Sequence, residues 1–81
     1  MTVRIVPFAR IREIVGNAVL ERTLAGGARA RDAFAALAAD FPQLAELERS
    51  TRFVRGDAFV TADTELHDGD DLGLLPPFGG G

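Results

Sequence analysis

The residues with the clearest chemical use stand at the C-terminal end of the sequence, which reads LLPPFGGG. Gly79, Gly80 and Gly81 carry no β-carbon, so they can enter a narrow channel and adopt the backbone conformation that an active site requires. A terminal carboxylate presented in this way can be adenylated at another protein's ATP site and then attacked by a nucleophile. We therefore expect the carboxylate of Gly81 to be the reacting group. The alternative is an ordinary frayed terminus.

Two prolines and a phenylalanine precede the glycines and would direct them. Pro76 and Pro77 hold φ near about −65° and favour an extended polyproline stretch, which stiffens the exit from the last apolar run. From Phe78 to Gly81 an extended chain reaches about 14 Å, at roughly 3.3–3.6 Å per residue. We expect residues 76–81 to form a flexible tail that projects away from the globule.

The rest of the sequence offers little chemistry. It has no cysteine and one histidine, so disulfides, thiol catalysis and a structural zinc site are not expected. His67 lies in the run HDGDD, which lacks the ligand spacing of a calcium loop and has the composition of a turn. Arg55-Gly56-Asp57 is explained as a hairpin tip. We expect no metal, no bound cofactor, and no serine, histidine and aspartate set for covalent catalysis.

Composition and charge limit the classes of partner. Twelve acidic and nine basic side chains give a formal net charge of −3, whereas binding to nucleic acid needs a clustered basic surface. No apolar run approaches the roughly 20 residues that span a bilayer, and the N-terminus lacks the apolar core of a signal peptide. We expect a cytoplasmic protein of one domain, with no nucleic-acid partner and no membrane partner.

The first half of the chain alternates between strand and helix patterns. Residues 2–7 place Val3 and Ile5 on one face, and Pro7, which cannot donate a ladder hydrogen bond, should end that strand. Apolar residues at helical spacing predict a short helix over 8–16, with Gly16 as its C-cap. A weaker strand is predicted within residues 17–24.

The main helix is predicted over residues 28–41, because its apolar residues form one stripe, made of Phe34, Leu37, Ala38 and Phe41. No Ser, Thr, Asp or Asn stands before it, and two arginines lie near its positive end, so the sequence does not explain its N-terminal cap. Pro42 should end this helix, and residues 43–48 are expected to add a turn or two.

The second half predicts a hairpin followed by a last strand. Two apolar pairs flank Gly56-Asp57 within residues 52–60, which is the pattern of a β-hairpin. A turn at 65–71 leads into a strand in which Leu72 and Leu74 alternate. This order of elements predicts an α+β fold of the β-grasp type, a mixed sheet packed on one main helix. The first and last strands should be parallel neighbours at its centre. We assign residues 1–75 to this domain and 76–81 to the tail.

One helix cannot cover both faces of a sheet, so we expect the opposite face to bind partners. Phe8, Phe59 and Leu75 each neighbour polar or turn residues, and they are the candidates for an exposed apolar patch at a partner interface. The alternative is that these three side chains complete the core.

Three stretches of the chain resemble the MoaD/ThiS-like family of ubiquitin-like sulfur carriers. They are FARIREIVG at 8–16, LHDGDDL at 66–72 and LLPPFGGG at 74–81. Within the family, the chain is most similar to the small subunits of molybdopterin synthase because of its double proline. The thiamine-pathway carriers share Gly-Gly but generally lack the prolines. The resemblance extends over nearly the whole chain, and the tail is its specific part.

This resemblance implies a mechanism and a set of partners. An E1-like enzyme, which uses ATP, would adenylate Gly81, and a sulfurtransferase would replace the AMP with sulfur to give a thiocarboxylate. In the molybdopterin branch the tail would enter the large subunit of the synthase and donate its sulfur to the pterin precursor. The chain would be a non-catalytic carrier subunit, and the catalytic residues would belong to the partner.

Three other functions stay open. The same carrier chemistry could serve another acceptor, such as thiamine synthesis, tRNA thiolation or cysteine synthesis. Gly81 could instead form an isopeptide with a lysine, as in a protein modifier. The chain could also be a plain interaction domain with a disordered tail.

Overall fold

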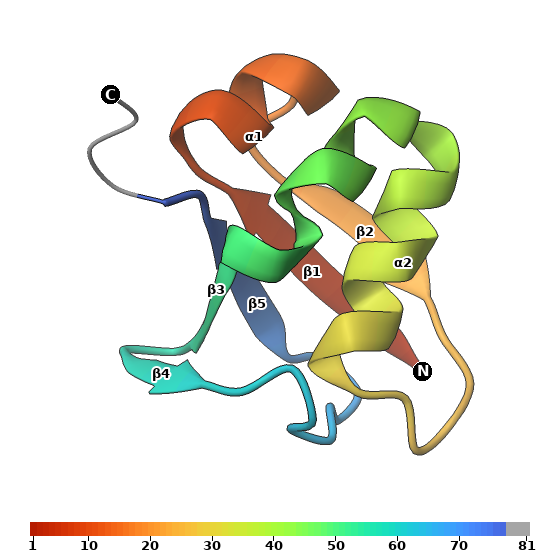
Figure 1. Ribbon diagram of the computed structural model, residues 1–81. Coiled ribbons are helices and arrows are strands. Elements are labelled where there is room, and N and C mark those ends of the chain that lie inside the picture. The colour runs from red at the N-terminus through yellow and green to blue at the C-terminus, as the bar shows by residue number, and fades with distance from the viewer. Residues whose placement is uncertain (78–81) are drawn as a thin grey trace.

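The computed structural model describes residues 1–77 and contains, within that range, five strands, two α-helices and one 3-10 helix (Figure 1). In chain order these are β1 (Thr2–Pro7), α1 (Ala9–Val15), β2 (Leu20–Thr23), α2 (Ala30–Asp40), η1 (Pro42–Ser50), β3 (Arg52–Arg55), β4 (Ala58–Val60) and β5 (Asp71–Leu75). The predicted order of elements is confirmed. The main helix is shorter than predicted, and the turns after it form a 3-10 helix of nine residues.

The five strands form one mixed sheet in the order β2-β1-β5-β3-β4. β1 and β5 are parallel neighbours at its centre, and the other pairings are antiparallel. The prediction of an α+β fold of the β-grasp type is therefore confirmed. Because β1 and β5 run in the same direction, β5 ends at the end of the sheet that lies far from the N-terminus (Figure 1).

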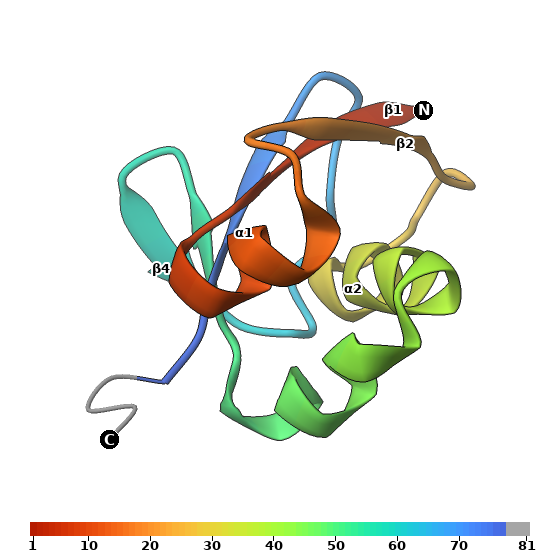
Figure 2. The ribbon, with the colours of Figure 1, turned by 90° about the horizontal axis from the view of Figure 1, so that it is seen from above.

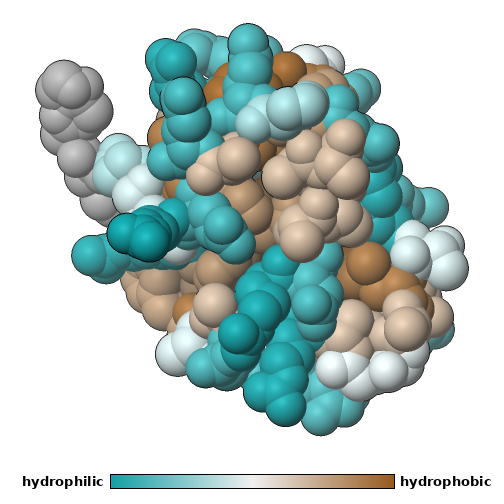
Figure 3. All heavy atoms as spheres, turned by 45° about the vertical axis from the view of Figure 1, so that its right-hand side comes forward, coloured by the Kyte–Doolittle hydropathy of each residue, from teal (hydrophilic) through white to brown (hydrophobic). Residues whose placement is uncertain are grey.

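One face of the sheet carries the core, and the helices all lie on that side of it (Figures 1 and 2). Val3 and Ile5 of β1 and Leu72 and Leu74 of β5 are fully buried against them. The helices supply the opposing buried side chains Ile11, Phe34, Leu37 and Leu44. On the side of the molecule that Figure 3 shows, hydrophobic residues lie among hydrophilic ones.

Pro7 and Gly16 mark the ends of the first two elements as predicted. Pro7 is the last residue of β1, and Gly16 adopts the left-handed conformation, with φ of 75°, at the C-cap of α1. Its N–H donates to the Arg12 carbonyl at 2.8 Å, which satisfies one of the orphan acceptors at the helix end. Because β1 ends at Pro7 and α1 begins at Ala9, the chain turns sharply between the strand and the helix.

The N-terminus of α2 receives its hydrogen-bond acceptors from a distant part of the chain. The N–H groups of Ala30 and Arg31 donate to carbonyls of the segment 61–66, at 2.9 and 3.0 Å. The Asp32 carboxylate accepts a hydrogen bond from the Arg29 N–H at 2.8 Å. These contacts provide the cap that the sequence alone left unexplained.

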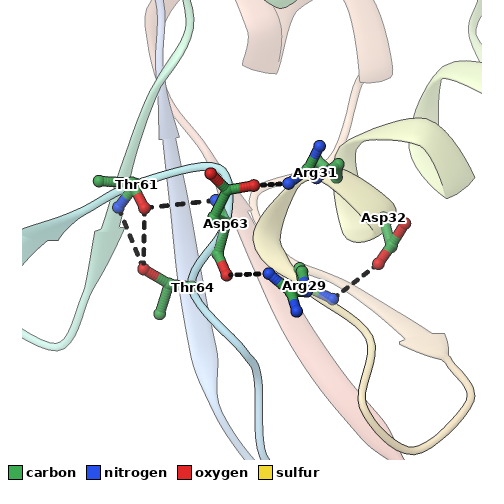
Figure 4. Close-up of polar contacts among 6 residues, drawn as sticks. All are labelled: Arg29, Arg31, Asp32, Thr61, Asp63 and Thr64. Carbon is green, nitrogen blue, oxygen red and sulfur yellow. Dashed lines mark hydrogen bonds and ion pairs between the residues drawn. The ribbon is translucent and has the colours of Figure 1, made fainter.

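The two arginines near this helix end hold the same segment in place (Figure 4). Arg31 forms an ion pair with the Asp63 carboxylate, and Arg29 donates to the Asp63 carbonyl oxygen at 3.3 Å. Within the segment, the Thr64 hydroxyl accepts a hydrogen bond from the Thr61 N–H at 3.1 Å. The Asp63 carboxylate thus compensates the positive charge of Arg31 near the helix N-terminus, and the Asp63 backbone binds Arg29.

Candidate docking face and tail root

Successive side chains of β5 lie on opposite faces of the sheet. Side chains alternate along a strand, so Leu72 and Leu74 point into the core while Gly73 and Leu75 point away from the helices. We call this second side of the sheet the outer face. Leu75 lies there opposite Arg52 of β3.

An apolar row crosses four strands of the outer face. The pairing registers place Val6 of β1 beside Gly73, Gly73 beside Val54, and Val54 beside Phe59 of β4. Val6 and Val54 are half-buried, and Phe59 is 64% exposed. The row therefore presents apolar surface that the protein's own helices do not cover.

The ring of Phe8 lies directly over Gly73. A β-carbon at that glycine would meet Cε2 of the Phe8 ring at 3.2 Å and Cβ of Val54 at 3.5 Å. The Phe8 N–H donates to the Leu74 carbonyl at 3.0 Å, which ties its backbone to β5. The next residue, Ala9, has φ of 48° and turns the chain off the sheet into α1. Gly73 thus provides the space in which an aromatic ring can approach the central strand closely.

The structure places all three predicted partner-binding residues on the outer face. Phe8 is 46% exposed and Phe59 is 64% exposed, so these two rings do not complete the core, whereas Leu75 is half-buried. Beside Phe8 lies a shallow groove of about 220 Å³, lined by Val6, Phe8, Val54, Gly56, Asp71 and Gly73. Contact of these residues with a partner stays a prediction.

The outer face is polar at its other end. Arg4 of β1 lies 3.5 Å from the Asp71 carboxylate and pairs in register with Glu21 of β2. This charged part lies at the beginning of β5, and the apolar row and Leu75 lie nearer the end of that strand. The uncovered apolar surface is therefore next to the point where the chain leaves the sheet.

The tail begins directly at this surface. β5 ends at Leu75, and Pro76 and Pro77 follow it, Pro77 being exposed. The predictions made for Phe78, Gly79, Gly80 and Gly81 lie outside the described residues. What the structure provides is the root of the tail, a central strand held by hydrogen bonds to a neighbour on each side.

Sequence reasoning missed Gly73 and the two valines that flank it on the outer face. The available signal was the glycine itself, since glycine inside an apolar strand marks a close approach of another group. Nothing local identified Phe8 as that group, because the two residues are brought together only by the parallel pairing of β1 with β5.

His67 occupies a turn, as predicted. Its side chain is 72% exposed, and its N–H donates to the Asp70 carboxylate at 2.8 Å. Within residues 1–77, no three or more His, Cys, Asp or Glu side chains are grouped so as to hold a metal ion. None of the helices described is long and apolar enough to cross a membrane.

Comparisons with known proteins agree on one family. The sequence profile of the ThiS family matches residues 5–81. A molybdopterin synthase sulfur carrier subunit from Chlamydomonas reinhardtii is 32% identical over 85 residues, which cover 100% of both chains.

Solved structures show the same fold. A molybdopterin converting factor, subunit 1, from Pyrococcus furiosus superposes with a TM-score of 0.83 at 28% identity, over 94% of this chain and 97% of that chain. SAMP1 from Haloferax volcanii has a TM-score of 0.83 at 24% identity over 100% of both chains, a likeness that shows the fold alone. Because the family profile and the full-length relative both extend over nearly the whole sequence, the chain belongs to the ThiS family of small carriers, as its resemblance predicts.

Proposed function

We propose that this chain is a sulfur carrier that acts as the small subunit of a molybdopterin synthase. The observation that carries the proposal is the full-length match to a molybdopterin synthase sulfur carrier subunit. The double proline and the glycine run support it, because proline restricts the backbone and glycine has no side chain that would block a narrow channel. The outer face supports it as well, since it offers apolar surface beside the root of that tail.

The proposed loading reaction takes place on the carboxylate of Gly81, taken as the terminal residue. A carboxylate oxygen attacks the α-phosphate of ATP held by an E1-like enzyme, pyrophosphate leaves, and an acyl-adenylate forms. The terminal sulfur of a persulfide on the sulfurtransferase then attacks the acyl carbon, and AMP leaves. A thiol of a partner protein reduces the resulting acyl disulfide and forms a disulfide with the sulfurtransferase. The product is a C-terminal thiocarboxylate. ATP and the catalytic groups belong to the partners, and this chain contributes the reacting terminus.

The proposed delivery reaction takes place in the large subunit of the synthase. The thiocarboxylate sulfur attacks a carbon of the pterin precursor and displaces an oxygen substituent from it, which gives a thioester. Water then attacks the acyl carbon and the acyl C–S bond breaks, so the sulfur stays on the precursor and Gly81 returns to a carboxylate. The acyl carbon must reach one depth in each partner's site for these steps. A tail rooted on the central strand, with Phe8, Phe59 and Leu75 docked beside it, would set that depth.

Deletion of Gly81 tests the function directly. We expect the shortened chain to keep its fold, because Gly81 carries no side chain and the buried hydrophobic residues found within residues 1–77 all lie before Leu75. We expect it to accept neither AMP nor sulfur from the partner enzymes. Mass spectrometry of the intact protein measures both, since the thiocarboxylate has one oxygen replaced by sulfur. Gly80→Val, which places a branched side chain in the channel, should give the same loss.

Two outcomes would contradict the proposal. One is a shortened chain that is loaded at the wild-type rate. The other is a wild-type chain that forms slow-migrating conjugates with other proteins but never a thiocarboxylate. The second result would identify a protein modifier.

A further inference from the structure

Two arginines lie at the root of the tail without an ion pair among the described residues. Arg49, near the end of η1, and Arg52, the first residue of β3, line a groove of about 460 Å³ together with Ser50, Thr51 and Pro77. Both arginines are exposed, and no carboxylate within residues 1–77 lies within 4.0 Å of either guanidinium.

The backbone between these arginines is fixed. Thr51 is buried, and its hydroxyl donates to the Leu47 carbonyl at 2.7 Å, where η1 passes into β3. Arg52 is held in register opposite Leu75, one residue before the prolines. The backbone positions from which the two arginine side chains extend are therefore defined beside the exit of the tail.

Charge is distributed unevenly along the sheet. Residues 57–71 contain six acidic side chains and no basic one, whereas residues 49–55 contain three arginines and no acidic one. The third of these, Arg55, lies opposite Leu72 and 3.6 Å from the Asp70 carboxylate, so it is compensated at the acidic end. Glu48 lines a second groove with both arginines, but the groove that Pro77 lines contains Arg49 and Arg52 and no acidic side chain.

We propose that Arg49 and Arg52 bind carboxylate side chains on the rim of the partner cleft that receives the tail. This inference rests on the proposed function, because it names a feature of the partner's surface. The planar guanidinium group matches a carboxylate with two parallel hydrogen bonds. Charges at the rim of an interface act mainly on the association rate and its dependence on salt. The arginine pair would thus orient the carrier before the tail enters, and the acidic residues 57–71 would keep its other end away from the rim.

The test measures association of the full chain with the large subunit of molybdopterin synthase by stopped-flow mixing. Arg49→Gln combined with Arg52→Gln should lower the association rate constant about five- to tenfold at low salt, and the difference should fade as the Debye length shortens. The matched control is Arg29→Gln combined with Arg31→Gln, which removes the same charge at the capped end of α2. The control should change the rate less than about twofold.

Several results would overturn the proposal. An unchanged rate in the tail-root variant would do so, and so would an equal loss in both variants, because net charge alone would then account for it. Inorganic phosphate at matched ionic strength provides a third arm. If it slows the wild type and the tail-root variant equally, the two guanidinium groups bind no oxyanion at this interface. A wild-type chain that neither binds the large subunit nor forms a thiocarboxylate would show that the proposed function itself is wrong.

A cross-linking experiment locates the carboxylates. The sequence contains no lysine, so Arg52→Lys introduces a unique side-chain amine at the tail root. A carbodiimide should join that amine to aspartate or glutamate side chains of the large subunit, and peptide mass spectrometry should place them around the cleft that receives the tail. Arg31→Lys is the control and should give no such product. Absence of the conjugate at position 52, or equal yields from both variants, would contradict the inference.

Discussion

The two faces of β5 are both apolar, but only one of them is covered. Leu72 and Leu74 are fully buried under the helices. On the other face, Leu75 is half-buried and the ring of Phe8, which lies over Gly73, is 46% exposed. Antiparallel and mixed sheets with one solvated face usually carry polar residues on it. The apolar residues on the buried face of this strand serve folding, and association with a partner is the role that we propose for those on the other face.

The uncovered face also changes in character along its length. The ion pair of Arg4 and Asp71 lies at the beginning of β5, the apolar row lies nearer the tail, and Arg52 lies opposite Leu75 at the end of the strand. A partner that binds the apolar part would at the same time receive the tail. The position of the apolar row therefore matters as much as its exposure.

The largest predicted effect is a difference in stability between variants of two neighbouring leucines, Leu74 and Leu75. Leu74→Ala removes a fully buried side chain and should lower the free energy of unfolding by about 2–5 kcal/mol. Leu75→Ala removes a half-buried one on the outer face and should lower it by about 1 kcal/mol or less. Urea unfolding followed by circular dichroism measures both. Equal losses would mean that the outer face contributes to the core.

The second effect should fall on binding instead of stability. Phe59→Ser removes the aromatic ring of the apolar row. It should weaken binding to the large subunit by about 2 kcal/mol or more, roughly thirtyfold. The melting temperature should change little. Val19→Ser is a matched control, because Val19 is 43% exposed but lies just before β2. Outright unfolding of the Phe59 variant, or equal loss of binding in the control, would contradict a docking role.

The fold was predictable because its signals are local. Alternation in residues 2–7, the glycine at 16 and the turn at 56–57 each specify an element within a few neighbouring residues, and the order of elements then permits few arrangements. Gly56 shows why the hairpin signal is reliable, since its φ of 64° is a conformation that glycine adopts at little energetic cost.

The cap of α2 and the seat of Phe8 were not predictable for the opposite reason. Both are made by residues far apart in the sequence. The first turn of α2 donates to segment 61–66, and Phe8 lies on Gly73 only because β1 and β5 are paired. The candidate docking residues could still be named, since a sheet with helices on one side must leave its other face open.

A smaller effect is expected from the stalk. Pro76→Gly combined with Pro77→Gly leaves the hydrogen bonds of β5 intact, so the melting temperature should barely move. The tail would lose a conformational restriction, and more entropy would be lost when a partner immobilises it. We expect binding to the adenylating enzyme to weaken by about 1–2 kcal/mol, roughly five- to thirtyfold. Titration calorimetry beside a thermal melt measures this. If the affinity for the adenylating enzyme is unchanged, the two prolines serve only to end β5.

The smallest effect should come from a single methyl group on the outer face. Gly73→Ala places a β-carbon 3.2 Å from the Phe8 ring, closer than an ordinary contact, so the ring must move by a few tenths of an ångström. The ring is half-exposed and can do so. Because Gly→Ala also reduces the entropy of the unfolded chain, the free energy of unfolding should change by less than about 1 kcal/mol in either direction.

Binding to the large subunit should nevertheless weaken by a few-fold, because the methyl group displaces Phe8 and partly fills the groove beside it. Gly26→Ala is the control, since a β-carbon there meets nothing within 4 Å. It should leave affinity unchanged while affecting the unfolded chain in the same way. Calorimetric titration of the two variants decides the point: if both bind like the wild type, the seat of Phe8 on Gly73 is a packing detail of the sheet. If only the Gly73 variant binds more weakly, the bare strand beneath the ring is part of the interface.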